Sequence, residues 1–239
     1  MEIFALTYKR AHQVVLGAGK RERAEISQRF FKTGPGEYGE GDVFCGLTVP
    51  QTRELAKKFG ELPFSEIKKL LSSEIHEERL LALLILVRRF ERGESAVRKK
   101  IYDFYLQNTA RVNNWDLVDL SADKIVGRHL LNRSIAPLLT LARSKILWER
   151  RVAIVSTFQF IRQANFRTTF KIVRVLISDG HDLIHKACGW MLREVGKRDS
   201  RILRDFLKLH SKSMPRTMLR YAIERFSKTE RKKYLAGLA

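Results

Sequence analysis

An internal repeat of about 35 residues restricts the fold of this chain more than any other feature. Five segments superpose on one small residue each, and neighbouring segments are offset by 36, 35, 34 and 35 residues. The superposed residues are Ala82, Val118, Ala153, Ala187 and Ala222. Each interval also contains a second amphipathic segment, and no stretch shows sustained β alternation. Two helices per repeat at a constant period indicate an all-α fold, an α-solenoid of stacked helix pairs with a concave face.

The segment before the repeats is expected to form helices around one glycine-rich loop. Apolar residues at helical spacing predict helices over residues 2–16 and 20–32. Residues 33–46 contain five glycines and a proline, which predicts a loop. This loop lacks a Gly-Lys-Ser or Gly-Lys-Thr ending, so we interpret it as a connector rather than a nucleotide site. Prolines near the starts of VPQTRELAKKF and LPFSEIKKLL predict two further helices.

We expect the whole chain, residues 1–239, to be a single domain. Its N-terminal helices and glycine-rich loop would occupy residues 1–75, and the regular repeats residues 76–239. A chain of this length can bury a sizeable core.

The charge balance points to a polyanionic partner. The chain has 46 Lys and Arg against 26 Asp and Glu, for a formal net charge of +20, and nucleic acid is favoured over a membrane surface. Residues 141–239 hold 23 of the basic and 8 of the acidic side chains. Cations on the concave face would follow a DNA backbone, because neutralising phosphates releases counterions. We therefore expect a basic groove that binds double-stranded DNA; solvated helix faces rich in Lys and Arg are the alternative.

Cysteine and histidine usage gives no metal or redox site. Cys45 and Cys188 are too few for a disulfide framework, and Cys188 lies in an apolar helix that suggests a core position. His181 and His185 are four apart, but no third ligand is evident, so a capping or surface role is favoured. The longest apolar run, LLALLILV, is too short to span a bilayer. We expect a reduced, cytoplasmic monomer without a cofactor or a membrane partner.

The stretch NNWDLVDLSAD, residues 113–123, is an acidic exception on this basic chain. Trp115 and Asp119 stand four apart, so a helix would place the indole and the carboxylate on one face. Asp116 and Asp123 are further anions nearby. A carboxylate kept where a polyanion is expected to bind suggests chemistry at a cationic reaction centre.

Two later repeats carry an arginine and a tryptophan that complete a recognisable set. Arg151 lies in LWERRVAI and Trp190 in HKACGWMLREVGKRD. Together with NNWDLVDLSA, these segments resemble the AlkD family of bacterial DNA alkylation repair glycosylases, which are built from HEAT-like repeats. The likeness covers nearly the whole chain, including FCGLTVPQTRELAKKF. Any one of these residues would be weak evidence, but their joint occurrence in this order is specific.

The resemblance implies a monofunctional glycosylase that excises cationic N3- or N7-alkylated purines from duplex DNA while the lesion stays stacked. Asp119 matches the catalytic carboxylate of the family, and Trp115 and Trp190 match aromatic residues that contact the deoxyribose. When the preceding Trp148 is aligned, Arg151 matches the arginine beside the backbone phosphate. Phe30 stands where the best-known member has a tyrosine. Further cations expected to contact DNA are Arg150, Lys186, Arg193, Lys197, Arg216 and Arg220.

Each of these residues also has a structural explanation. A tryptophan in a solenoid usually fills the interface between repeats, and Asp119 could be a surface anion. Helical phase places Trp190 about 120° from Trp115 in the aligned repeats, so only the resemblance brings the set together. Two other functions stay open, a non-catalytic DNA-binding protein and a protein-interaction scaffold. Base release from methylated DNA, and loss of partners after nuclease treatment, would separate the three.

Overall fold

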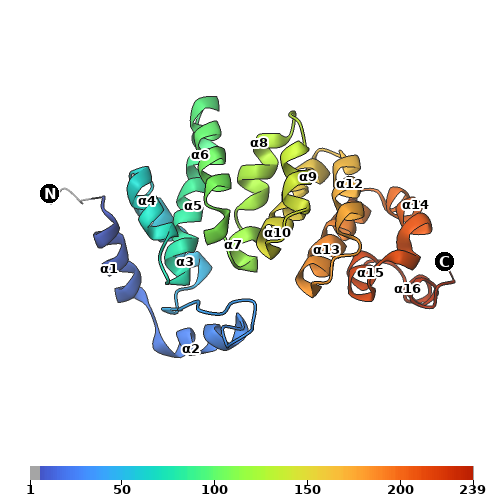
Figure 1. The fold of residues 1–239 in the computed structure, drawn as a ribbon, viewed down its shortest axis with the longest axis horizontal. Helices are drawn as coiled ribbons and strands as arrows, with labels where there is room; N and C mark the ends of the chain where they lie inside the picture. Colours follow the sequence, from blue (N-terminus) through green and yellow to red (C-terminus); the bar gives the residue numbers. More distant parts are fainter. Residues whose placement is uncertain (1–5, 239) are drawn as a thin grey trace. The chain divides into compact units, whose positions relative to one another are not determined.

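The computed structural model describes residues 6–238 as helices joined by loops, with a long glycine-rich loop between α2 and α3 (Figure 1). No β-strand occurs within these residues; extended backbone makes one isolated parallel bridge, between Val43 and Ile75. The prediction of an all-α fold is therefore confirmed, and the packed helices are consistent with an α-solenoid. The helices divide into two compact units, one ending at Ser121 and one beginning at Ala122. None of the described helices combines the length and the apolar character that crossing a membrane would need.

The first unit contains seven α-helices and a short 3₁₀ turn within the described residues. They are α1 (Tyr8–Ala18), α2 (Arg21–Phe30), α3 (Val49–Lys58), α4 (Phe64–Leu71), α5 (His76–Arg92), α6 (Ser95–Gln107), the 3₁₀ turn η1 (Thr109–Arg111) and α7 (Trp115–Asp119). The predicted helices over residues 2–16 and 20–32 correspond to α1 and α2, although residues 2–5 lie outside the described part. Pro50 lies in the first turn of α3, where a capping box of Thr48 and Gln51 satisfies the backbone donors.

Helix α5 is the centre of the first unit. Helices α3, α4 and α6 pack against it, and 13 of its 17 residues are buried. An apolar helix that is covered on nearly every side belongs to the core, which explains the continuous run LLALLILV. Its first turn is unusual, because the four consecutive side chains His76, Glu77, Glu78 and Arg79 are all charged or titratable and all buried.

The glycine-rich segment is a loop, as predicted. Gly36, Gly41 and Gly46 have positive φ angles, which glycine adopts without strain. Gly46 also approaches the backbone of α2 so closely that a Cβ atom would lie 2.2 Å from the Lys20 carbonyl oxygen. The loop therefore depends on glycine for its path between α2 and α3.

The second unit is built from helix pairs. Its elements are the π-helix η2 (Asp123–Gly127), α8 (Arg128–Leu130), α9 (Ala136–Ala142), α10 (Leu147–Ser156), α11 (Phe158–Arg162), α12 (Phe166–Leu176), α13 (Asp182–Arg198), α14 (Ser200–His210), the 3₁₀ turn η3 (Ser211–Ser213), α15 (Arg216–Ala222) and α16 (Lys228–Leu235). Helix α13 packs against α10, α14 and α15. Gly189 permits the contact with α15, because a Cβ atom there would lie 2.6 Å from the Met218 carbonyl oxygen.

The small residues that define the repeat register all lie in the core. Ala82, Val118, Ala153, Ala187 and Ala222 are at most 1% exposed, so the predicted close packing at these positions is confirmed. The second segment of each interval also forms a helix, namely α6, α9, α12 and α14. The repeat pattern therefore predicts both helices of each pair. The single HEAT-like domain over residues 1–239 stays a prediction.

Candidate active site

Helix α7 carries the first two predicted site residues. It has five residues; Trp115 is the first and Asp119 the last, so their side chains lie one turn apart on one face, and both are half-buried. Asp116, Leu117 and Val118 between them are buried and attach the helix to the unit. Asn114 caps the helix, and its side-chain oxygen accepts a hydrogen bond from the Trp115 backbone N–H at 2.8 Å.

The Trp115 indole lies at the end of a column of aromatic rings. It stacks on Phe31 with a centroid distance of 5.0 Å and an interplanar angle of 12°. Phe31 stacks in turn on Phe44 at 4.8 Å, and Phe44 on the His76 imidazole at 4.4 Å. Phe30 meets the indole edge-on at 5.8 Å and is itself 63% exposed. The end of α2 and the glycine-rich loop thus fix the indole plane.

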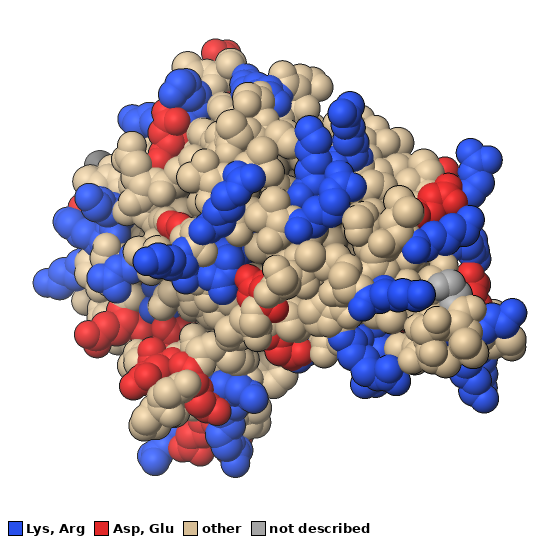
Figure 2. Space-filling view, turned by 45° about the vertical axis from the view of Figure 1, so that its right-hand side comes forward, with Lys and Arg blue, Asp and Glu red and all other residues tan. Residues whose placement is uncertain are grey.

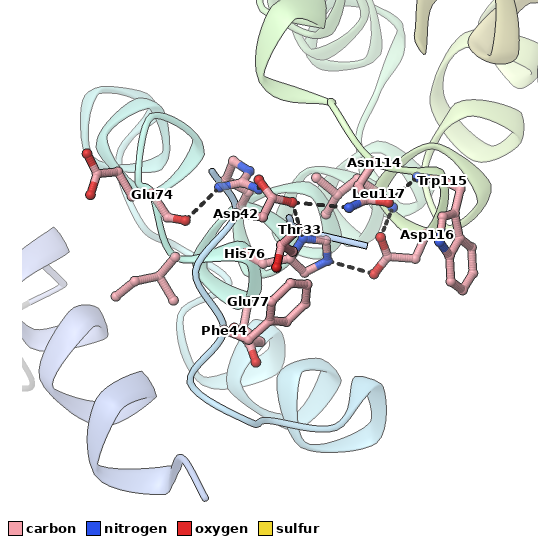
Figure 3. A network of polar contacts seen from close by, with 12 residues as sticks. Thr33, Asp42, Phe44, Glu74, His76, Glu77, Asn114, Trp115, Asp116 and Leu117 are labelled. Carbon is pink, nitrogen blue, oxygen red and sulfur yellow. Dashed lines mark hydrogen bonds and ion pairs between the residues drawn. The ribbon is translucent and has the colours of Figure 1, made fainter. Parts of the chain in front are cut away.

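A buried network of charged groups surrounds His76, the last ring of this column (Figure 3). His76 Nδ1 lies 3.1 Å from Asp42 Oδ2, and His76 Nε2 lies 2.8 Å from Asp116 Oδ2. Arg79 Nη2 donates to Asp42 Oδ1 at 2.5 Å, and Asn114 Nδ2 donates to Asp42 Oδ2 at 3.1 Å. All five residues are at most 7% exposed. The network joins the glycine-rich loop, the start of α5 and the start of α7.

Burial and charge act in opposite directions on the pKa values of this network. Burial alone would lower the pKa of His76, but the Asp116 carboxylate and the hydrogen bonds to Asp116 and Asp42 raise this pKa to about 9. Burial alone would raise the pKa of Asp42, but the hydrogen bond to His76 and the charge of Arg79 hold it below its ordinary value. The geometry therefore favours charged forms of both groups at neutral pH.

Glu77 fixes the other end of the loop. Its carboxylate accepts hydrogen bonds from the backbone N–H groups of Cys45, Gly46 and Leu47, at 3.0, 2.7 and 3.2 Å. Arg79 also donates to the carbonyl oxygens of Ser73 and Glu74. The first turn of α5 thus organises the segment that supports the indole.

Of these supporting residues, the sequence pointed only to Asp116, as an anion near Trp115 and Asp119, and not to its contact with His76. The run HEER before an apolar helix was a detectable signal, because four charged or titratable residues at the start of a core helix need partners. Their partners could not be found in the same way. Asp42 and Asp116 are 34 and 40 residues from His76 and have no fixed spacing to it.

The second unit positions the other two predicted site residues. Arg151 on α10 is 5% exposed and donates through Nη1 to the Leu183 carbonyl oxygen of α13 at 2.7 Å. Trp190, on α13, is half-buried, and its ring lies 6.1 Å from that of Phe158. The guanidinium groups of Arg162 and Arg198 cover Phe158 at 4.4 and 5.7 Å. Trp190 therefore belongs to a surface of aromatic and cationic side chains.

Most of the cations predicted to contact DNA also have partners within the chain. Arg150 pairs with Asp179 at 2.6 Å, and Arg193 pairs with Glu224. Lys186 pairs with Asp182 at 2.6 Å and Lys197 with Glu194 at 2.6 Å, whereas Arg216 donates to the Leu235 carbonyl oxygen at 3.1 Å. Arg220 is exposed and lines a pocket with Lys186. Their contacts with DNA stay predictions.

The charge of the chain is visible on its surface. In the face that Figure 2 shows, blue Lys and Arg side chains are widely distributed, and red Asp and Glu side chains form smaller groups.

Two smaller predictions, on His181 and Cys188, are also confirmed. His181 caps α13 by accepting from the Leu183 N–H at 3.1 Å, and Cys188 is a fully buried core residue.

The comparisons with known proteins identify the family. The family model described as DNA alkylation repair enzyme matches residues 13–226. The chain belongs to this family. The assignment supports a role in the repair of alkylated DNA, an enzymatic activity, and DNA as the substrate.

A solved structure gives independent support for the fold. It is described as a predicted DNA alkylation repair enzyme from Enterococcus faecalis and has 18% sequence identity to this chain. The match has a TM-score of 0.67 and covers 88% of this chain and 97% of that one. No curated protein matches the sequence.

Proposed function

We propose that the protein hydrolyses the N-glycosidic bond of N3- or N7-alkylated purines in duplex DNA. The observation that carries this proposal is the pairing of Trp115 and Asp119 on one face of α7, in a chain of the DNA alkylation repair family. The high net positive charge supports a polyanionic substrate.

The proposed reaction needs little help at the leaving group. An alkylated purine of this kind carries a positive charge, so the electron pair of the breaking C–N bond neutralises the base as it departs. Positive charge then develops on the deoxyribose, as in other glycoside hydrolysis, and water adds to the anomeric carbon and loses a proton. The Asp119 carboxylate would stabilise the cationic sugar and orient the water.

The remaining residues of the set would bind rather than react. The faces of Trp115 and Trp190 favour a cationic sugar by about 0.5 to 2 kcal/mol for each contact. Arg151 would bind the adjacent phosphate and offset the repulsion between Asp119 and the DNA backbone. Arg150 is the matched comparison, because its side chain is 18% exposed and already holds Asp179 at 2.6 Å. Alanine variants of both arginines would decide which one contacts phosphate.

The direct test is release of the modified base. Wild-type protein incubated with methylated duplex DNA should release 3-methyladenine or 7-methylguanine faster than a heat-only control. Asp119→Asn should abolish most of the release while duplex affinity stays near wild type, because the lost charge acts mainly in the transition state. Asp103→Asn, which removes an exposed carboxylate paired with Lys99, is the charge-matched control and should stay active.

The results that contradict the proposal are also specific. Salt-dependent binding with equal affinity for alkylated and unmodified DNA, without release of any base, would indicate a non-catalytic DNA-binding protein. Full activity of Asp119→Asn would remove this carboxylate from the mechanism.

A further inference from the structure

His76 lies between two carboxylates in a way that fixes its protonation. Carboxylates at neutral pH only accept hydrogen bonds, and one lies within hydrogen-bond distance of each ring nitrogen, at 3.1 and 2.8 Å. Both nitrogens must therefore donate, which makes the ring an imidazolium. With Arg79, the buried cluster contains two cations and two anions, so its charge is balanced.

Both carboxylates connect His76 to a residue next to Trp115: Asp116 follows the tryptophan directly, and Asp42 binds Asn114, which precedes it. Asp116 binds the imidazolium through Oδ2, and its Oδ1 accepts the Leu117 backbone N–H at 2.8 Å. Asp42 binds the imidazolium and also accepts from Asn114, the residue that caps α7. The imidazolium therefore holds α7 from the residue before the indole and from the residue after it.

A helix of this size depends on such contacts. Helix α7 has five residues, and isolated helices much shorter than about 12 residues are not stable in water. Its position is thus set by tertiary interactions. The column of aromatic rings adds a second connection between His76 and α7. The imidazole stacks on Phe44, Phe44 on Phe31, and Phe31 on the Trp115 indole.

We propose that His76 is a positioning residue for base excision: its bridge between Asp42 and Asp116 fixes the start of α7, and with it the Trp115 indole and the Asp119 carboxylate. The role in catalysis rests on the proposed function. A misplacement of about 1 Å at a reacting centre can cost about 100-fold in rate, so a short helix that carries the carboxylate needs a fixed position.

The structure offers a matched control for His76. His12 Nδ1 lies 2.6 Å from Glu78, so this histidine binds the same first turn of α5 but connects it to α1 instead of α7. We expect His76→Gln to lower the single-turnover rate of 7-methylguanine release by about tenfold or more, with affinity for unmodified duplex within about twofold. His12→Gln, assayed at a temperature where both variants are folded, should keep the wild-type rate. Equal rates for the two variants would overturn the proposal.

A second measurement uses the wild-type protein and stays informative if His76→Gln does not fold. The charged groups that face His76 are Asp42 from the loop, Asp116 from α7 and Arg79 from its own helix. NMR can follow the His76 ring nitrogens and the Trp115 indole N–H while the pH is raised. The indole resonance should move together with the His76 titration. A Trp115 indole N–H chemical shift that stays constant while His76 titrates would refute the positioning role.

The two measurements separate failure of the proposal from failure of the proposed function. If wild-type protein releases no base but the Trp115 resonance follows His76, then His76 holds α7 and the reaction assignment is wrong. If base is released and neither the indole nor the rate responds to His76, the reaction stands and the positioning role is wrong.

Discussion

The protonation of His76 predicts an unusual loss of stability in mildly alkaline solution. This side chain is 2% exposed, and its pKa rises from 6.5 to about 9 against the Asp116 and Asp42 carboxylates despite the cost of burial. In the unfolded chain those partners are absent, so the pKa returns to about 6.5. The folded protein therefore holds this proton more tightly than the unfolded chain.

The sign and size follow from proton linkage. Below pH 6.5 both states carry the proton, and its stabilisation is fully present. Between pH 6.5 and about 9 the unfolded chain has lost the proton and the folded protein has not, so the free energy of unfolding falls by about 1.4 kcal/mol per pH unit. The total loss is about 3 kcal/mol, a large part of the 5 to 15 kcal/mol typical of a domain.

Three other groups with a shifted pKa affect stability outside this interval. The pKa values of His181 and His210 are lowered, chiefly by burial, so their contribution to stability is complete by pH 6.5. Burial, with a smaller effect from Glu77, raises the pKa of Cys45 to about 12, so this thiol destabilises the fold only above its ordinary value of 9. His76 is therefore the group we expect to dominate between pH 6.5 and 9.

Urea unfolding followed by circular dichroism at pH 6.5, 7.5 and 8.5 measures the effect. Wild type and His12→Gln should both lose stability across this series, because both keep the His76 proton. His76→Gln should be less stable at pH 6.5 and should show a much flatter dependence on pH. Parallel pH profiles for wild type and His76→Gln would refute the assignment of the imidazolium.

Two other substitutions test the packing and the cluster. Gly189→Ala should cost about 1 to 3 kcal/mol in chemical unfolding, because its Cβ would meet the Met218 carbonyl oxygen at 2.6 Å, whereas Gly17→Ala on the open face of α1 should not destabilise. His76→Phe alone should cost about 3 to 5 kcal/mol by leaving Asp116 buried and unpaired. Adding Asp116→Leu should restore much of that stability, since Asp42 keeps Arg79, but should not restore base release. Restored release in the double variant would show that the ion cluster serves stability alone.

The sequence predicts the helix pairs well because each pair repeats the same local pattern. Ala153, Ala187 and Ala222 fall in the core where the register places them, and α6 has the bounds of its predicted segment. The helix expected after Asp119 differs clearly, because it stops, turns at Leu120 and Ser121, and continues as the π-helix η2. The later repeat segments are also interrupted at Thr157 and end early at Ala222.

This interruption has a tertiary cause that spacing does not reveal. The Ser121 hydroxyl donates to the Leu117 carbonyl oxygen, one turn earlier, and lies 3.0 Å from the Tyr105 hydroxyl. Such back-bonding by serine bends helices, and Tyr105 holds the bend in place. The break ends α7 immediately after Asp119, so the carboxylate lies at a helix end rather than in the middle of a long helix.

In the site, too, residues close together in the sequence could be predicted and residues far apart in the sequence could not. Trp115 and Asp119 could be proposed from sequence because they are one helical turn apart, a spacing with a fixed geometric meaning. The residues that hold them could not, because Asp42 and His76 come from a loop and a helix with no periodic relation to α7. Apolar packing alone is non-directional, whereas hydrogen bonds to both nitrogens of an imidazolium fix distance and orientation together. Leu117 and Val118 attach the five-residue helix α7 by apolar packing, and the two buried carboxylates and the histidine at this junction add directional contacts that fix its orientation.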